Sequence, residues 1–283
     1  MKFTLLLKKM LLSKFFVMGT AGVILITGLC LFYDVLLPFD PTLADYSVML
    51  QNPDWFANGL NGHILGTDAL GRDILTRLLK GGTYSLKLAF ISVGVAAVIG
   101  CILGTFAGYY GKWLDMLIMR IADVQLTIPS LMLAIALVAI LGPNEKNLII
   151  VLIISGWAKF ARIIRGNVMA LRDSEFISAS RVLGASDLWI MFKQIFPNVL
   201  TPTIIFASQQ LGYVILVEAS LSYLGLGIQP PNPSWGVMIA NGRDYLQTAP
   251  WIVLAPGFTL SLAVLSFNFL GDGIRDVLDP KMK

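Results

Sequence analysis

Long stretches without a charged side chain constrain this chain more than any other feature. An α-helix needs about 20 apolar residues to cross the hydrocarbon core of a bilayer, because each residue adds about 1.5 Å. Runs free of Asp, Glu, Lys and Arg cover residues 15–33, 88–111, 124–144, 147–158, 194–217, 219–242 and 245–271. The sequence therefore predicts an all-α integral membrane protein.

The composition supports a chain whose surface largely faces lipid. Hydrophobic residues make up 56% of it and charged residues only 13%, whereas soluble domains are about 25% charged. The net charge is +4, with Lys and Arg gathered at the ends of the apolar runs, which indicates membrane orientation and not nucleic-acid binding. Cys30 and Cys101 lie inside apolar runs, so we expect buried thiols, with no disulfide framework, metal site or cofactor.

Two of the runs need separate treatment. The run 219–242 contains Pro230, Pro231 and Pro233, which is typical of a loop, so we expect mostly a connection there. The short run after residue 147 is extended to about residue 165 by Lys159 and Arg162, whose long side chains can reach the membrane interface. Six transmembrane helices are therefore predicted, at about 15–37, 84–110, 116–141, 147–165, 199–221 and 250–271.

The basic residues predict the orientation of these helices. The N-terminus is basic and then apolar without a cleavage site, which favours an uncleaved first span. With that terminus in the cytoplasm, 15 of the 21 Lys and Arg residues lie inside, as the positive-inside rule requires. We therefore expect a multi-pass protein of the cell (inner or plasma) membrane with both termini cytoplasmic. The expected segments are a cytoplasmic N-terminus (1–14), the first transmembrane helix (15–37), an external loop (38–83), a five-helix core (84–271) containing a cytoplasmic loop (172–198), and a cytoplasmic tail (272–283).

The external loop is too long for a simple turn. Apolar residues recur at helical spacing between polar ones, which predicts an amphipathic helix lying on the outer surface. The apolar positions are Leu70, Ile74, Leu75, Leu78 and Leu79.

The cytoplasmic loop predicts a helix–turn–helix. The first helix opens at Ser174 and ends at Gly184, because glycine adopts a left-handed backbone at low cost. Ser186 is a good N-cap for the second helix, and Pro197 is expected to stop it. Leu188, Ile190, Met191, Phe192 and Ile195 make the second helix more apolar than a solvated loop requires. Either the loop packs back on its own membrane helices, or it docks into a groove of a soluble partner.

The spacing of this loop resembles the EAA loop of ABC-importer permeases. That pattern is Glu-Ala-Ala, three residues, Gly, nine residues, Ile, one residue and Leu-Pro. Aligned on Gly184 and Pro197, Ala179 also agrees, whereas Ser178, Ser180, Gln194 and Phe196 replace the other positions. Glu175 lies three residues before Ser178 on the same helical face and is the candidate to replace the missing acid. The resemblance implies contact with an ATPase through Glu175, Ser178, Ala179, Ser180, Gly184, Ala185, Ser186 and Pro197.

Three other stretches resemble the second permease subunit of dipeptide, oligopeptide and nickel importers. They are residues 63–73, residues 218–236 and residues 267–280, so the resemblance covers about residues 60–280. It implies a type I ABC importer permease fold that forms half of a translocation path. The implied partners are a second homologous permease, two cytoplasmic ABC ATPases and an extracytoplasmic solute-binding protein, which would dock on residues 38–80 or 225–250. The solute stays open between dipeptides, longer peptides, nickel and metal chelates.

Several residues inside the apolar sequence are candidates for the translocation path. Glu218 either lines the path or outer gate, or is an interfacial carboxylate capped by the turn at residues 225–227, because a charge in the bilayer is costly. Pro129 is expected to kink the third span.

Asp123 is expected to pair with Arg120. Gly100, Gly104 and Gly108 form a small-residue stripe that we expect to pack internally.

Two other classes of protein compete with a permease subunit. The chain has no phosphate-binding Gly-x-x-x-x-Gly-Lys-Ser/Thr loop and no His-Glu-x-x-His motif, which argues against an enzyme. An ion-coupled secondary transporter places ionisable groups near the middle of the membrane and often shows inverted repeats. The spans here hold almost no charge and show no repeat. The expectation is a passive permease powered by separate ATPase subunits.

Overall fold

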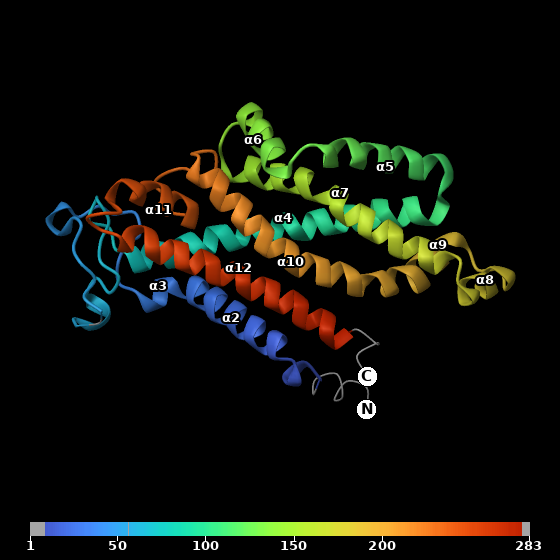
Figure 1. Cartoon of the computed structure of the whole chain (residues 1–283), viewed down its shortest axis with the longest axis horizontal. Coiled ribbons are helices and arrows are strands. Elements are labelled where there is room, and N and C mark those ends of the chain that lie inside the picture. Colours follow the sequence, from blue (N-terminus) through green and yellow to red (C-terminus); the bar gives the residue numbers. More distant parts are fainter. Residues whose placement is uncertain (1–8, 56, 279–283) are drawn as a thin grey trace.

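The described part of the chain is built from helices. The computed structural model describes residues 9–55 and 57–278, and these residues contain no β-strand (Figure 1). The long helices are α2 (Lys14–Leu31), α4 (Ile74–Tyr110), α5 (Lys112–Thr127), α6 (Ser130–Leu141), α7 (Glu145–Arg172), α10 (Phe196–Tyr223) and α12 (Trp251–Leu278). The short elements are α3 (Tyr33–Leu36), η1 (Tyr46–Val48), η2 (Gly59–Asn61), α8 (Glu175–Val182), α9 (Asp187–Ile190), the π-helical turn η3 (Met191–Ile195), α11 (Trp235–Gly242) and η4 (Arg243–Tyr245).

The long helices run roughly along one axis, which gives the molecule two distinct ends. The segment that follows α3 lies at one end of the molecule together with helix α11, and α8 lies at the other end (Figure 1). The N-terminal end of α2 and the C-terminal end of α12 point toward the α8 end. Five helices are long and apolar enough to cross a bilayer, and α5 with α6 forms a bent pair that would make a sixth span. This agrees with the predicted membrane architecture.

The predicted amphipathic helix on the outer surface does not form a separate element. Residues 74–80 instead make the first turns of α4, and Ile74, Leu78 and Leu79 are buried. Gly81 and Gly82 leave room for other segments to lie against this part of the helix. A Cβ on Gly81 would lie 3.2 Å from the Cα of Ser234, and the Trp235 ring packs beside Gly82. The indole nitrogen of Trp235 also donates to the Leu78 carbonyl at 2.9 Å.

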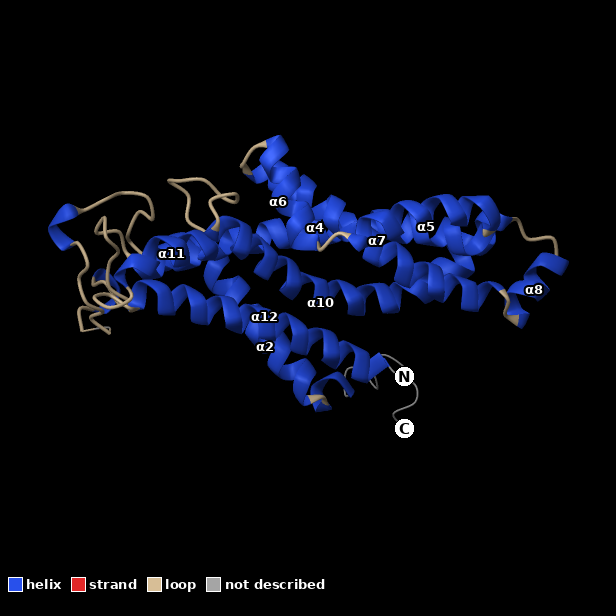
Figure 2. Cartoon of the chain, turned by 45° about the horizontal axis from the view of Figure 1, so that its top comes forward, coloured by secondary structure: helices blue, strands red, loops and turns tan. Residues whose placement is uncertain are grey.

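The third predicted span is broken rather than kinked. α5 and α6 meet at an angle of 91°, and Pro129 is the N-cap residue of α6. A proline lacks the backbone N–H that would continue α5, and its ring disfavours a helical residue before it. In Figure 2, α6 projects from the side of the paired helices α4 and α7.

The region around Pro197 also differs from expectation. The second helix predicted for this loop does not stop there, since α9, η3 and α10 form one continuous helical run over Asp187–Tyr223. A proline inside an α-helix clashes with the carbonyl four residues earlier, which here belongs to Lys193 within η3. The wider π turn relieves that clash. The residues predicted as a connection also contain the last turns of α10 and the whole of α11.

The stripe of small residues packs internally, as predicted. Gly100, Gly104 and Gly108 all face α7, and a Cβ on Gly104 would lie 2.5 Å from the Ala161 carbonyl oxygen. The close approach joins α4 and α7 along much of their length. Cys30 and Cys101 are buried free thiols, which confirms that part of the prediction.

Candidate functional site

The loop that the sequence predicts to be cytoplasmic folds as a hairpin of α8 and α9, residues 174–190, called here the α8–α9 hairpin. Gly184 adopts a φ of +81°, the left-handed conformation that glycine permits. The amide of Ala185 donates to the Ser180 carbonyl and the amide of Gly184 to the Arg181 carbonyl, both at 3.0 Å. This pair of bonds is the Schellman motif that ends helices. The Ser186 hydroxyl accepts the Trp189 amide at 3.4 Å, so Ser186 caps α9 as predicted.

One face of the hairpin packs against the membrane helices. Ile177 and Ile190 are fully buried, and they join Ile195 of η3 in a small apolar cluster with Ile164 and Val168 of α7. This cluster is separate from the main core, which lies further along the bundle. The spacing of Ile177, Val182 and Leu183 along the sequence predicts that they share one face of α8, which is wrong. Ile177 points inward, whereas Val182 and Leu183 lie at the exposed tip beside Gly184.

Polar contacts fix the hairpin to the end of α4. The Tyr109 hydroxyl donates to the Asp187 carboxylate at 2.5 Å, and the Arg181 guanidinium lies 5.4 Å from the centre of the Tyr109 ring. The Arg172 side chain donates to the backbone carbonyls of Gly108 and Tyr109 at 3.3 and 3.4 Å. The hairpin is therefore attached to α4 as well as to α7 and α10. The sequence did not predict these contacts of Tyr109 and Arg172. Tyr109 and Asp187 are 78 residues apart, and Arg172 and Gly108 are 64 residues apart, so no local pattern connects them.

The opposite face of the hairpin is apolar and exposed. Val182 and Leu183 are 88% and 87% exposed, the highest values among the large hydrophobic residues of this segment. The exposed apolar face, as we call it, consists of Phe176, Val182, Leu183, Leu188, Trp189 and Phe192. One face of the hairpin therefore packs back on the membrane helices, as one interpretation of the sequence predicted. The other face is exposed, and its docking into a soluble partner stays a prediction.

The residues that the resemblance selected fall on this hairpin with different surroundings. Glu175 begins α8, and its side chain is exposed together with those of Ser178 and Ala179. Ser180 is half-buried and accepts a 2.6 Å hydrogen bond from Gln194. Ala185 is half-buried, and Ser186 and Pro197 are exposed. Next to the hairpin, Arg172 contacts Asp173 at 3.0 Å, and this hydrogen bond lowers the pKa of the Asp173 carboxyl.

Glu218 is fully enclosed by protein. Its carboxylate is 0% exposed and accepts hydrogen bonds from Ser85 of α4 at 2.8 Å and from Ser222 at 2.6 Å. The Ser222 hydroxyl in turn accepts the Ile228 amide at 3.3 Å, which links Glu218 to the turn after α10. These contacts favour the structural interpretation of this acid over a position on an open path.

Asp123 has a different partner from the expected one. It pairs with Arg162 of α7 rather than with Arg120. A second pair joins the same two helices, since Arg165 contacts Asp115 of α5 through two nitrogens at 2.5 and 2.7 Å. Both pairs hold α5 against α7, so the acids of α5 serve packing between helices.

The described residues form an all-helical bundle with a bent α5–α6 pair and an exposed hairpin at one end. The fold is that of type I ABC importer permeases. It matches two inward-facing crystal structures of the MetNI methionine ABC transporter, with TM-scores of 0.58 and 0.56 at 21% identity. The match covers 72% of this chain and 97% of that chain in the first of them.

Residues 100–283 match the family described as binding-protein-dependent transport system inner membrane component. This chain belongs to that family and is a permease subunit. It is 46% identical to the dipeptide transport system permease protein DppC of Alkalihalophilus pseudofirmus, over 94% of this chain and 86% of the relative. It is 42% identical to the di/tripeptide transport system permease protein DppC of Pseudomonas aeruginosa, over 94% and 88%. It is 41% identical to the glutathione transport system permease protein GsiD of Pectobacterium atrosepticum, over 92% and 85%.

Proposed function

We propose that this chain forms half of the translocation path of an ATP-driven importer of di- and oligopeptides. The observation that carries the proposal is the exposed apolar face of the α8–α9 hairpin, which is held rigidly on its other side. Exposed apolar side chains on short helices suit docking into the groove of a soluble protein. A second homologous permease completes the path, and two cytoplasmic ATPases receive the two hairpins.

The peptide solute is supported by the relatives. Their names specify dipeptides, di- and tripeptides, and glutathione, which is itself a tripeptide. The nickel alternative has no such support from these three proteins. An extracytoplasmic binding protein delivers the solute, as the family description implies.

The hairpin acts as a lever in this proposal. It continues directly into α10 through η3 and follows α7 after a short break, and Tyr109 attaches it to α4. ATP can shift the equilibrium between the inward- and outward-facing arrangements only if the ATPases bind the hairpin with different affinities in the two arrangements. A rigid hairpin transmits that difference to three membrane helices at once.

The proposed orientation places the α8 end in the cytoplasm and the α11 end outside. The basic residues of the sequence support it through the positive-inside rule. Both ends of the chain then lie on the cytoplasmic side, since the start of α2 and the end of α12 point toward the α8 end (Figure 1). Segments 38–73 and 225–250 face the binding protein.

The experiment that tests this function changes the tip of the hairpin. In Leu183→Asp, a charge replaces an apolar side chain that contributes nothing to the core, so the protein should insert and fold normally. We expect the ATPases to be lost from the purified complex, because a carboxylate in an apolar groove is desolvated without a partner. Co-purification of the ATPases and ATP-dependent uptake of a dipeptide into vesicles measure this.

The matched control is Leu43→Asp, which places the same change on an exposed leucine of the segment before η1, at the opposite end of the molecule. It should leave the ATPases bound. ATPase binding that survives Leu183→Asp would contradict the proposed docking face. Uptake that follows a proton or sodium gradient without ATP would instead favour the secondary transporter.

A further inference from the structure

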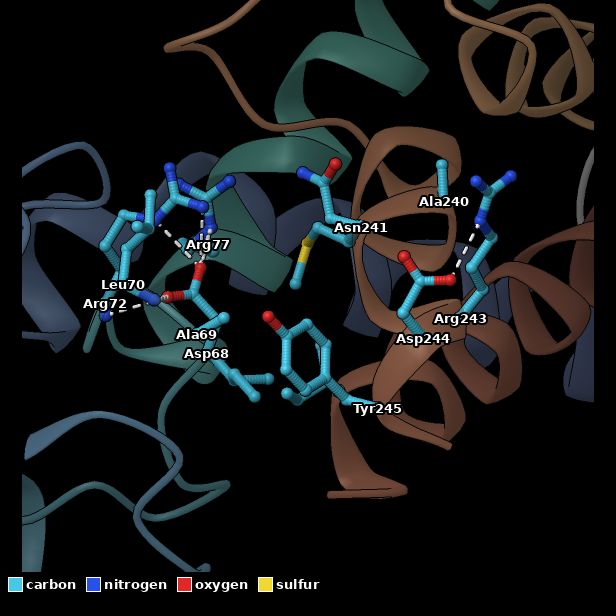
Figure 3. A pocket seen from close by; sticks show the side chains of 13 residues that line it. Asp68, Ala69, Leu70, Arg72, Arg77, Ala240, Asn241, Arg243, Asp244 and Tyr245 are labelled. Carbon is cyan, nitrogen blue, oxygen red and sulfur yellow. Dashed lines mark hydrogen bonds and ion pairs between the residues drawn. The ribbon is translucent and has the colours of Figure 1, made fainter. Parts of the chain in front are cut away.

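A cavity of about 400 Å³ lies at the α11 end of the molecule, far from the α8–α9 hairpin (Figure 3). One wall comes from residues 68–77, which include the turn before α4 and its first residues. The opposite wall comes from the end of α11 and from η4, and Ile252 of α12 closes the base. The volume is within the range of small-ligand sites, about 300–1,000 Å³.

The first wall carries an excess of positive charge. Arg72 contacts the Asp68 carboxylate at 2.8 Å, and Arg77 contacts the same oxygen at 3.4 Å. Asp68 also accepts the backbone amides of Leu70 and Arg72. One carboxylate thus serves two guanidinium groups, so the residues of this segment that line the cavity carry a net charge of +1. Asp73 does not line the cavity, because its carboxylate contacts His63 and Thr76 instead. Arg77 is only 2% exposed, and the Pro41 carbonyl accepts a further 2.6 Å bond from it, so its position is fixed.

The second wall presents polar groups that the protein does not use. The Asn241 amide and the Tyr245 hydroxyl line the cavity, and neither side chain makes a hydrogen bond within residues 9–55 and 57–278. Figure 3 shows the Tyr245 hydroxyl directed across the cavity toward the Asp68 side. Asp244 also lines the cavity. Among the described residues, its exposed carboxylate contacts only the neighbouring Arg243, at 3.3 Å.

We propose that this cavity binds the C-terminal carboxylate of a peptide solute at the outer mouth of the path. The inference rests on the proposed function and adds a binding site on the permease itself. Arg72 and Arg77 attract the carboxylate, Asn241 and Tyr245 donate hydrogen bonds to it, and Asp244 lies within the same cavity to receive the peptide ammonium. Guanidinium groups are well suited to carboxylates because their donors are fixed in one plane.

The test uses the assembled complex in lipid nanodiscs, without binding protein or nucleotide. Saturation-transfer NMR follows titration with alanyl-alanine and, separately, with alanyl-alanine amide. We expect the acid to bind and the amide to bind at least about tenfold more weakly. Tyr245→Phe and Asn241→Ala should each weaken binding of the acid about tenfold, the effect of losing one hydrogen bond to a charged group. Tyr110→Phe, at an exposed tyrosine that ends α4 at the other end of the molecule, is the matched control and should leave binding of the acid unchanged.

Equal binding of acid and amide would overturn the inference, and so would unchanged binding in Tyr245→Phe and Asn241→Ala. Another outcome is that Tyr245→Phe and Asn241→Ala leave binding of alanyl-alanine unchanged and weaken only the binding of the solute-binding protein to the complex. In that case the cavity receives an acidic side chain of that protein, and the inference is again wrong. A complex that retains its ATPases and imports alanyl-alanine with ATP, but fails these tests, leaves the proposed function intact. Loss of ATPase binding in Leu183→Asp tests that function separately.

Discussion

At the scale of single residues, Glu218 shows how a charged group is accommodated inside the bundle. Its two carboxylate oxygens accept hydrogen bonds from Ser85 and Ser222, so it ties α4 to α10. A buried carboxylate without such partners would be strongly unfavourable. A part in the outer gate stays a prediction, and substitution separates the two roles.

We expect Glu218→Ala to destabilise the protein by about 2–4 kcal/mol, because two buried hydroxyls lose their acceptor. Glu218→Gln keeps the shape and one acceptor oxygen, so its stability should fall by less, and it should transport normally. Melting temperature in detergent and dipeptide uptake measure the two effects. A Gln variant that folds like the original chain but no longer transports would show that the carboxylate acts in the gate.

Ser180 and Gln194 are two places where the hairpin departs from the pattern it resembles, and they contact each other. Gln194 donates to the Ser180 hydroxyl at 2.6 Å, and that hydroxyl donates to the Phe176 carbonyl at 3.0 Å. The two polar residues therefore replace an apolar pair by a hydrogen-bonded one. The bond joins α8 to η3 and closes the base of the hairpin.

A double-mutant cycle tests this pairing. Ser180→Ala alone leaves the half-buried Gln194 amide without its acceptor and should cost about 1–3 kcal/mol. The double variant Ser180→Ala/Gln194→Ile restores an apolar pair and should be more stable than Ser180→Ala. Thermal unfolding of the four proteins gives the coupling energy, expected to be about 0.5–1.5 kcal/mol. Purely additive effects would mean that the bond contributes nothing.

At the scale of elements, the approach of α4 to α7 determines the packing of the bundle. The glycine stripe of α4 lets its backbone contact α7 directly, which suits helices in lipid, where association depends on close packing. The ion pairs of Arg162 and Arg165 then attach α5 to the other side of α7. α7 is therefore the helix through which the hairpin, α4 and α5 are joined.

Two glycines on the same helix allow a matched test of this packing. In Gly104→Ala the new Cβ lies 2.5 Å from the Ala161 carbonyl oxygen and 3.0 Å from the Ile164 Cβ, so α7 must shift. We expect a loss of about 1–3 kcal/mol. A Cβ on Gly94 meets nothing within 4 Å, so Gly94→Ala should be neutral or stabilising by up to about 1 kcal/mol. Equal melting temperatures of the two variants would contradict the packing role.

The continuity of α9, η3 and α10 is a second property of the elements. Because α9 and α10 form one helical run, a rotation of α9 reaches the Glu218 contact without crossing a flexible loop. The α-helical hydrogen bonding of that run changes at the π turn, and Pro202 inside α10 also lacks the N–H for one bond. π turns often occur at functional sites, and this one lies at the base of the proposed lever.

At the scale of the whole molecule, the orientation in the membrane decides which end meets ATP. We expect Ser178→Cys in α8 to react with a maleimide that cannot cross the membrane only after the cytoplasmic side is opened. Ser47→Cys in η1 should react in intact cells. Cys30 and Cys101 are both buried, so the background should be low. Labelling of residue 178 in intact cells would reverse the proposed orientation and remove the ATPase interaction.

The sequence by itself determined the helical class, the approximate spans and the turn at Gly184. These features depend on local causes: an apolar run must be long enough to cross a bilayer, and a left-handed residue favours glycine. The internal packing of the glycine stripe also followed from the residue type. The resemblance correctly indicated the family, because several motifs stood in order along the chain.

Only the tertiary structure decided which partner each polar or apolar side chain meets. Ile177 is buried and Val182 exposed, although both are apolar residues of one short helix, since only one side of α8 faces α7. Asp123 pairs with Arg162 because the bend at Pro129 lays α5 along α7. Residues 68–77 and 238–245 form one cavity although they are far apart in sequence. Such contacts depend on how distant helices pack, which local patterns of hydrophobicity and turn chemistry do not specify.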